Sequence, residues 1–176
     1  MIIFQNLIVT MCCPSIKSIS LMFSITGMLL SLYALHVETQ ASKDPEYEAL
    51  CDISSLSLSC SKVLTSSYGR GFGVISIIFG DSHPLNQPNS VYGIIFYSIM
   101  IIMALLNNKI MSSIQFYMSL SSVIMSLYLA YILYFILEEL CPLCVSTYAV
   151  NFILFITRYY TILFYSVYSL CIHIYL

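Results

Sequence analysis

The 176-residue sequence contains little charge and no tryptophan. Only 8% of its residues are charged and 60% are hydrophobic, whereas soluble domains carry roughly 25% charged residues. This shortage excludes an ordinary soluble domain, and with six basic residues we expect no nucleic-acid partner. Because tryptophan is absent, the fifteen tyrosines must supply the aromatic belt at a membrane surface. The composition therefore predicts an integral membrane protein.

Long apolar runs predict four membrane-spanning helices, at about residues 16–37, 89–107, 110–137 and 141–163. A hydrocarbon core of ~30 Å requires about 20 helical residues, which the second run reaches only with its flanks. The polar segment 38–88 is then one loop, and no second domain is expected. The predicted fold class is an all-α, four-helix membrane bundle. The apolar lead 1–13 is expected at the interface, and the placement of the apolar tail 164–176 is left open.

The distribution of charge predicts how the bundle is oriented. Lys17, Lys109 and Arg158 lie at helix ends that a four-helix topology places on one side, whereas the long loop contains most of the acidic residues. Cytoplasmic loops are enriched in Lys and Arg, so both termini are predicted to be cytosolic. The loop then faces a compartment that permits disulfides.

The sequence E-E-L-C-P-L-C-V-S-T-Y places a Cys-x-x-Cys pair, Cys141 and Cys144, where charge and proline interrupt the apolar runs. With Pro142 as the first helical residue, Cys144 is the third, among backbone N–H groups that favour a thiolate. Glu138 and Glu139 oppose that effect. The segment predicts a redox centre at a membrane surface. A coincidental pair or half of a zinc site are the alternatives.

A second pair, Cys51 and Cys60, lies in the loop with eight residues between its members. It is either a static loop disulfide or a dithiol that passes electrons to Cys141 and Cys144 through a mixed disulfide. The spacing does not distinguish the two. A four-cysteine zinc site is less favoured, because its ligands are typically separated by two to four residues. No metal is therefore expected.

The loop continues with S-S-Y-G-R-G-F-G, residues 66–73, whose glycines permit a tight backbone. We call this segment the lid. The apolar run V-I-S-I-I-F that follows is too short to span and is expected to dip into the membrane interface.

Three polar residues suggest how a ligand is bound. Asn89 either caps the second helix or donates a hydrogen bond to a ligand between the helices. Tyr148 follows Cys144 by four residues and Asn151 follows it by seven, so all three share one face of the helix. A polar group one turn from a thiolate, inside an apolar bundle, suits a flat hydrophobic substrate with a carbonyl or epoxide oxygen.

Taken together, several motifs carry a family resemblance. In order they are S-L-Y-A-L-H-V, C-D-x7-C-S, G-R-G-F-G, L-N-Q-P-N-S-V-Y-G-I-I-F-Y, S-L-Y-L-A-Y-I-L-Y-F and C-x-x-C-V-S-T-Y. The sequence resembles the vitamin K epoxide reductase family, and most of all its vertebrate 1-like branch, over about residues 24–156. The family usually has seven residues between the two loop cysteines, where this sequence has eight. The family also usually has a tryptophan at the position of Tyr68. Its members also end in a polar tail, and Cys12, Cys13 and Cys171 match no family role.

The resemblance implies an endoplasmic-reticulum membrane enzyme that reduces vitamin K 2,3-epoxide to the quinone and the quinone to the hydroquinone. It implies that Cys141 and Cys144 are the active-site pair, with Cys144 facing the substrate, and that Cys51 and Cys60 relay electrons. Asn89 and Tyr148 would hydrogen-bond the quinone oxygens. No permanently bound cofactor is implied. A lumenal thioredoxin-like protein would supply electrons, and 4-hydroxycoumarins such as warfarin would compete for the pocket.

Two other functions share parts of this pattern. A quinone-coupled thiol oxidase would use the same fold and thiols in the opposite direction, which the sequence does not exclude. A claudin-like structural protein also has two loop cysteines, but it needs a tryptophan-rich loop motif and has no Cys-x-x-Cys at its fourth helix.

Overall fold

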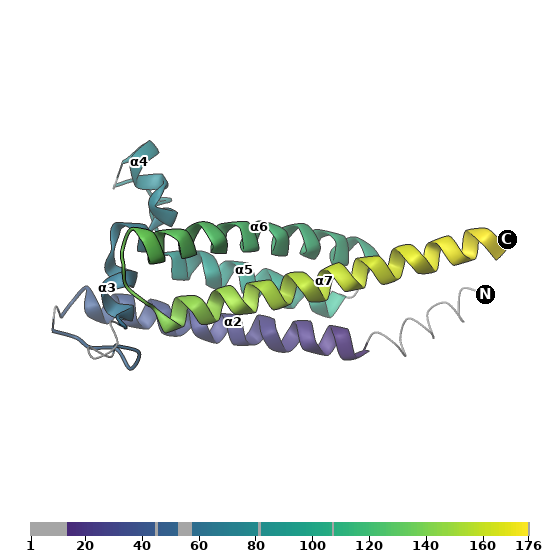
Figure 1. Ribbon diagram of the computed structural model, residues 1–176, viewed down its shortest axis with the longest axis horizontal. Coiled ribbons are helices and arrows are strands. Elements are labelled where there is room, and N and C mark those ends of the chain that lie inside the picture. Colours follow the sequence, from purple (N-terminus) through teal and green to yellow (C-terminus); the bar gives the residue numbers. More distant parts are fainter. Residues whose placement is uncertain (1–13, 45, 53–57, 81, 107, 176) are drawn as a thin grey trace.

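The computed structural model describes residues 14–175 apart from 45, 53–57, 81 and 107, and this part of the chain is all-helical (Figure 1). Its long helices are α2 (Pro14–Ala41), α5 (Asn89–Leu106), α6 (Lys109–Phe135) and α7 (Pro142–Tyr175). Short elements lie between α2 and α5, namely α3 (Cys60–Thr65), η2 (Ser67–Gly69), η3 (Gly71–Gly73) and α4 (Ile75–Phe79). Among the described residues, β-pairing is limited to two isolated bridges, Leu58 with Leu140 and Arg70 with Pro88.

Three of the long helices, α2, α5 and α6, are long and apolar enough to cross a membrane. Helix α7 is longer still, but it is not among these three helices, and it contains the polar residues Asn151 and Arg158. A fourth crossing by α7 therefore stays a prediction.

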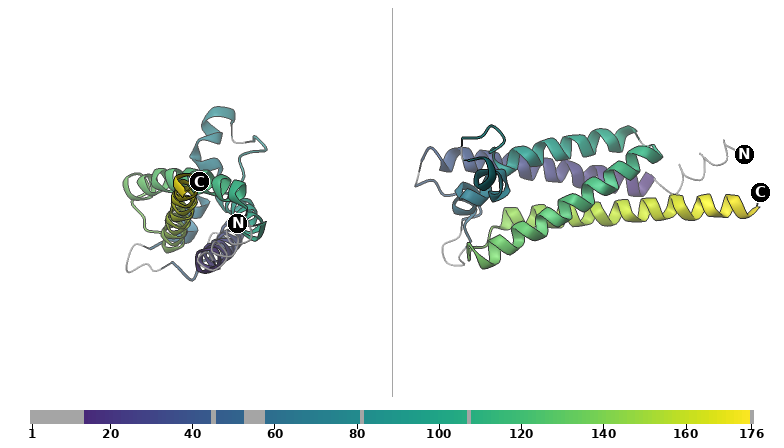
Figure 2. Two further views of the ribbon diagram at one scale, coloured as in Figure 1. Left: turned by 90° about the vertical axis from the view of Figure 1, so that its right-hand side faces the viewer. Right: turned by 90° about the horizontal axis from the view of Figure 1, so that it is seen from above.

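The long helices run alongside one another, with α2 against α5 and α7, and α6 against α7. Figure 2 shows that α6 runs obliquely, joining α5 at one end of the bundle and lying beside α7 at the other. The loop elements gather at the end where α7 begins, whereas α2 begins and α7 ends at the opposite end (Figure 1). The fold thus brings the loop cysteines to the Cys-x-x-Cys segment.

The helix boundaries differ from the predicted ones at several points. Helix α2 begins at Pro14 and continues past residue 37 to Ala41, because Glu38 is buried and paired rather than exposed. Helix α6 ends at Phe135, shortly before Glu138 takes a positive φ of 53°. Helix α7 continues to Tyr175, so it extends beyond residue 163 into the apolar tail. The expected lead 1–13, with Cys12 and Cys13, lies outside the described residues.

Small residues allow α2 and α5 to approach closely. A Cβ at Gly27 would lie 2.3 Å from the ring of Tyr97, and a Cβ at Gly93 would lie 2.5 Å from Oγ of Ser31. Small residues at helix interfaces are typical of membrane bundles, where packing rather than water exclusion holds the helices together. This contact fixes α5, which carries Asn89 at its start.

Two apolar clusters form the described core. The first lies at the loop end and includes Cys60, Cys141 and Leu143, with Cys51 and Cys144 packed against it. The second lies deeper in the bundle and consists of Tyr97, Met100, Val150 and Leu154. The cysteines of both pairs thus belong to one packed cluster.

Helix α4 projects from the bundle, as Figure 1 shows. Its Ile77, Ile78 and Phe79 side chains are 81%, 63% and 60% exposed. Such a contiguous apolar surface is costly in water, which supports the prediction that this segment dips into the membrane interface.

Candidate active site

The first turn of α7 determines the environment of the Cys-x-x-Cys pair. Pro142 is the first helical residue, where its missing N–H leaves no hydrogen bond unmade, and Cys141 immediately precedes it. The backbone N–H of Cys144 donates to Sγ of Cys141 at 3.2 Å, and the N–H of Val145 donates to the Cys141 carbonyl at 3.0 Å. Cys141 thus occupies the position whose side chain caps the helix.

This geometry favours a thiolate at Cys141. The side chain of Cys144 donates to the Cys141 sulfur and lowers the pKa of the Cys141 thiol, and the N–H groups of Cys144 and Leu143 add to that effect. Burial and the charge of Asp52 raise the pKa of Cys141, but its pKa stays below the usual value. The sequence predicts the helix-start effect at Cys144. The structure instead directs the helix N–H groups to the cysteine one position before the helix.

The loop cysteines Cys51 and Cys60 form a disulfide, with Cα atoms 5.9 Å apart. Cys60 is the first residue of α3, and the side chain of Ser59 caps this helix by accepting from the Lys62 N–H. The Asp52 carboxylate accepts hydrogen bonds from the N–H groups of Ala49, Cys60 and Ser61 and from the Ser61 hydroxyl. Asp52 therefore holds the disulfide-bearing loop against the start of α3.

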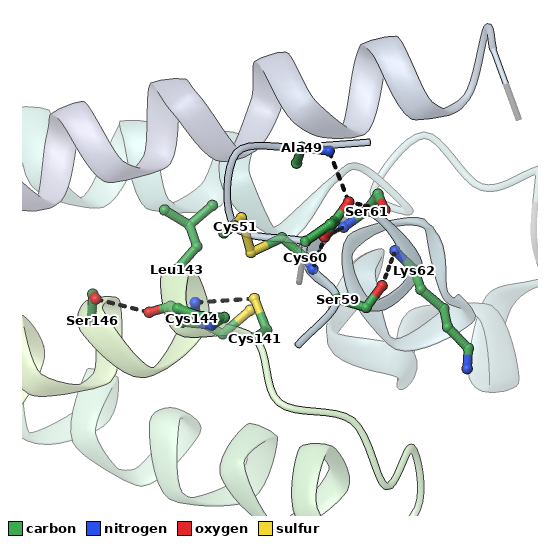
Figure 3. The surroundings of a disulfide bond; sticks show 12 residues. Ala49, Cys51, Ser59, Cys60, Ser61, Lys62, Cys141, Leu143, Cys144 and Ser146 are labelled. Atoms are coloured by element: carbon green, nitrogen blue, oxygen red, sulfur yellow. Dashed lines mark hydrogen bonds between the residues drawn. A yellow bond between two sulfur atoms is a disulfide. The ribbon is translucent and has the colours of Figure 1, made fainter. Parts of the chain in front are cut away.

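Backbone and ionic contacts attach this loop to the segment before Cys141. The Ser59 N–H donates to the Leu140 carbonyl at 3.0 Å, so the residues that precede Cys60 and Cys141 are bonded to each other. The Lys62 ammonium group pairs with Glu139. Figure 3 shows the disulfide beside the first turn of α7, with Cys141 on the side of that turn that faces the disulfide. The two cysteine pairs are thus docked together.

A metal site does not fit these residues. Among the described residues, ligand atoms of Cys51, Asp52 and Cys60 lie within 4.8 Å of one another. The two sulfurs are bonded to each other, and both carboxylate oxygens of Asp52 accept hydrogen bonds. This group therefore lacks the thiolates that a zinc site requires.

A cavity of about 370 Å³ lies between the lid and helices α2, α3, α5, α6 and α7. Ligand sites typically have volumes of roughly 300–1,000 Å³ and are mostly apolar with a few polar groups. Here the lining is mostly apolar, and Cys144 belongs to it while Cys141 does not. Cys144 therefore faces the cavity, and the fully buried Cys141 packs in the cluster that contains Cys60.

The chain is similar in sequence to known proteins. A model of the vitamin K epoxide reductase family matches residues 18–159. The chain belongs to the vitamin K epoxide reductase family. It is 43% identical to vitamin K epoxide reductase complex subunit 1 of Rattus norvegicus over 127 residues, covering 72% of this chain and 78% of the rat protein. It is 41% identical to the Mus musculus protein of that name over 133 residues, covering 76% and 82% respectively. Membership makes the chain an oxidoreductase.

For this member of the family, the structure places Asn89 on the cavity wall with its side chain bonded to the lid. Its Oδ1 accepts from the Phe72 N–H at 2.8 Å, and its Nδ2 donates to the Tyr68 carbonyl at 2.7 Å. Asn89 therefore anchors the lid rather than capping α5 through its side chain. The amide nitrogen retains a second hydrogen that a ligand can accept.

Tyr148 also lines the cavity, one turn beyond Cys144. Among the described residues, no group forms a hydrogen bond with its hydroxyl, so this group is free to bind a ligand oxygen. The geometry thus brings Asn89, Cys144 and Tyr148 to one cavity and keeps Cys51, Cys60 and Cys141 behind it.

The groups that hold the lid in place include an ion pair that the sequence does not indicate. Arg70 pairs with Glu38 at 3.3 Å, and the Ser90 hydroxyl donates to the same carboxylate. Gly71 and Gly73 adopt positive φ angles of 52° and 71°, and a Cβ at Gly73 would lie 2.4 Å from the Tyr68 ring. The glycines gave a signal for a tight lid. The Glu38–Arg70 pair gave none, because 32 residues separate its members.

Proposed function

We propose that this protein reduces vitamin K 2,3-epoxide to the quinone, and the quinone to the hydroquinone, with electrons from Cys141 and Cys144. Each step oxidises one dithiol to one disulfide, and epoxide reduction also releases one water. The observation that carries this proposal is that the two cysteines of the Cys-x-x-Cys pair face different surroundings. Cys144 lines an apolar cavity of substrate size, and Cys141 packs on the side of the loop disulfide.

For the epoxide, the sulfur of Cys144 attacks a ring carbon and one epoxide C–O bond breaks. Tyr148 and Asn89 hydrogen-bond the substrate oxygens, including those that gain negative charge. The freed oxygen takes up one of the two thiol protons. Cys141 then attacks the Cys144 sulfur, the carbon–sulfur bond breaks, and its electron pair restores the ring double bond as hydroxide leaves. That hydroxide takes up the second proton, which gives water and the Cys141–Cys144 disulfide.

The second part of the proposal concerns the supply of electrons. A lumenal thioredoxin-like protein reduces Cys51, and Cys60 exchanges with Cys141 through a mixed disulfide. Docking of Ser59 on Leu140 supports this route, because it holds the loop pair beside Cys141. The lowered pKa of Cys141 makes its thiolate a good leaving group from the mixed disulfide, which favours electron flow toward the cavity. The quinone-coupled thiol oxidase would require the opposite flow.

The proposed setting is the endoplasmic-reticulum membrane, with four crossings, cytosolic termini, and the loop and active site at the lumenal face. Family membership and the three apolar helices support it. We further propose that 4-hydroxycoumarins compete for the cavity, because they are flat and bear oxygens that Asn89 and Tyr148 can bond. No permanently bound cofactor is required, because both electrons come from cysteine thiols.

The test measures anaerobic epoxide turnover by purified protein with one of two reductants, dithiothreitol or a reduced thioredoxin-like protein. We expect Cys144→Ala to be inactive with both, because the active-site disulfide needs both sulfurs. Cys60→Ala should retain turnover with dithiothreitol, which reduces the Cys141–Cys144 bond directly, and lose it with the protein reductant. Turnover by Cys144→Ala would contradict the catalytic role. Wild-type behaviour of Cys60→Ala with the protein reductant would contradict the relay and leave the loop disulfide as a structural bond.

A further inference from the structure

Two consecutive hydrogen bonds link three side chains that line the cavity, on the helices that lead away from the lid. The Tyr97 hydroxyl donates to Oδ1 of Asn151 at 2.8 Å, and Nδ2 of Asn151 donates to Oγ of Ser126 at 2.9 Å. The three side chains come from α5, α7 and α6, line the cavity, and are at most 8% exposed. We call them the floor network. It joins three of the helices that line the cavity.

The floor network lies about two helical turns from Asn89 and from the reacting Cys144, and less than one turn from Tyr148. Tyr97 follows Asn89 by eight residues on α5, and Asn151 follows Cys144 by seven on α7. At a rise of about 1.5 Å per residue, these separations correspond to about 10–12 Å along each helix. The network therefore does not contact the reacting sulfur, and it acts on the site through the helices.

The direction of the Tyr97 hydroxyl is fixed by packing. The Tyr97 ring lies on α2 at Gly27, where a Cβ would approach it to 2.3 Å. The ring of Phe96 packs against it edge-on, with centroids 5.1 Å apart. Tyr97 itself is 1% exposed. A side chain held this tightly presents its hydroxyl to Asn151 in one geometry, so the hydrogen bond sets the local spacing between α5 and α7.

We propose that the floor network is a positioning device for the quinone, and that Tyr97 and Asn151 set the separation of Asn89 and Tyr148 across the cavity. The inference rests on the proposed function, in which these two residues hold the substrate oxygens. Asn89 begins α5 and Tyr148 lies in the second turn of α7. Loss of the link lets the two helices shift, and small displacements of binding groups reduce rates strongly.

The test separates the two half-reactions of the full-length protein in detergent. In one, dithiothreitol reduces the Cys141–Cys144 disulfide without quinone. In the other, quinone or epoxide oxidises the reduced pair anaerobically, and the new disulfide is quantified after acid quenching. For Tyr97→Phe, which retains the ring on Gly27, we expect the second-order rate of the quinone half-reaction to fall about tenfold, equivalent to about 1.4 kcal/mol. The dithiothreitol half-reaction should be unchanged.

A matched control is available at Gln115. Its Nε2 donates to the Met100 carbonyl at 2.9 Å, which joins α6 to α5 through a side chain that is 1% exposed and outside the cavity lining. We expect Gln115→Met to lower thermal stability about as much as Tyr97→Phe and to leave both half-reactions unchanged. If Tyr97→Phe does not fold, Asn151→Ala removes the same hydrogen bond between α5 and α7 from the other side and serves as the same test.

The outcomes distinguish this inference from the proposed function. If wild-type protein is not oxidised by quinone or epoxide, the proposed function fails and the inference with it. A wild-type quinone half-reaction in the floor variant would overturn the inference alone. So would an equal loss in Gln115→Met, or a parallel loss of both half-reactions, because these results would indicate general loosening of the bundle.

Discussion

Replacing Asp52 by alanine should loosen the disulfide-bearing loop without unfolding the bundle. The carboxylate accepts hydrogen bonds from the N–H groups of Ala49, Cys60 and Ser61 and from the Ser61 hydroxyl. Hydrogen bonds to a charged group contribute about 1.5–3 kcal/mol each when buried, but Asp52 is partly exposed and its partners can bind water instead. We therefore expect a loss of about 1–2 kcal/mol, the size usual for removal of a helix cap.

The assay is hydrogen–deuterium exchange of the peptide that covers residues 58–64. A loss of 1–2 kcal/mol raises the population of locally open loop about 5- to 30-fold, and amide exchange should accelerate by that factor. Asp44→Ala is the control, because Asp44 lies in the same loop and accepts one exposed hydrogen bond from Glu46. Unchanged exchange in Asp52→Ala, or equal acceleration in both variants, would refute the argument.

The pH dependence of this effect follows from the pKa of Asp52. Burial raises that pKa, but hydrogen bonds from the Ser61 hydroxyl and from three backbone N–H groups outweigh burial and hold it below the usual value. A carboxyl whose pKa is lower in the folded protein stabilises it fully above its unfolded pKa of about 3.9. The contribution is lost as pH falls through the folded pKa. The difference in exchange between wild type and Asp52→Ala should therefore persist at neutral pH and shrink only in acid.

Three further predictions concern the substrate, the lid and the topology. Tyr148→Phe and Asn89→Ala should each reduce turnover, by on the order of 10²-fold for one lost donor to an oxygen that gains charge; wild-type rates in both would contradict their binding roles. Arg70→Met leaves the buried Glu38 without its cation, so we expect the lid to open more often and KM to rise several-fold, roughly as for other lost charged hydrogen bonds. An unchanged KM would show that the ion pair does not hold the lid. A cysteine introduced at Lys109 should resist membrane-impermeant labels that react from the lumenal side with the reduced loop cysteines, and labelling there would contradict the proposed topology.

The sequence predicts the helices of this protein better than it predicts the contacts of its site. Apolar runs in the sequence predict the long helices, because a helix that crosses the lipid needs about 20 predominantly apolar residues with few charges. Helix ends are less predictable, since the extension of α2 beyond residue 37 depends on Glu38 finding Arg70 in the lid. That pairing is a property of the tertiary structure.

The site shows the same division between local and non-local information. The proximity of Cys141 to Cys144 follows from two intervening residues at a helix start, and family motifs direct attention to Asn89. The bond from Asn89 to the lid depends on a loop that folds back over α5. The link between Tyr97 and Asn151 joins residues 54 positions apart, so no local pattern indicates it.

The most direct test of the central claim is a single turnover without added reductant. Protein whose cysteines have been fully reduced is mixed anaerobically with vitamin K epoxide, and quinone and cysteine disulfides are quantified in the same quenched sample. Wild type and the control Cys171→Ala should form one cysteine disulfide for each quinone produced in that turnover, at Cys141–Cys144 or, after exchange through the relay, at Cys51–Cys60, and Cys144→Ala should form neither quinone nor disulfide. Quinone produced without either disulfide, or no quinone from reduced wild-type protein, would contradict the claim that Cys141 and Cys144 reduce the substrate.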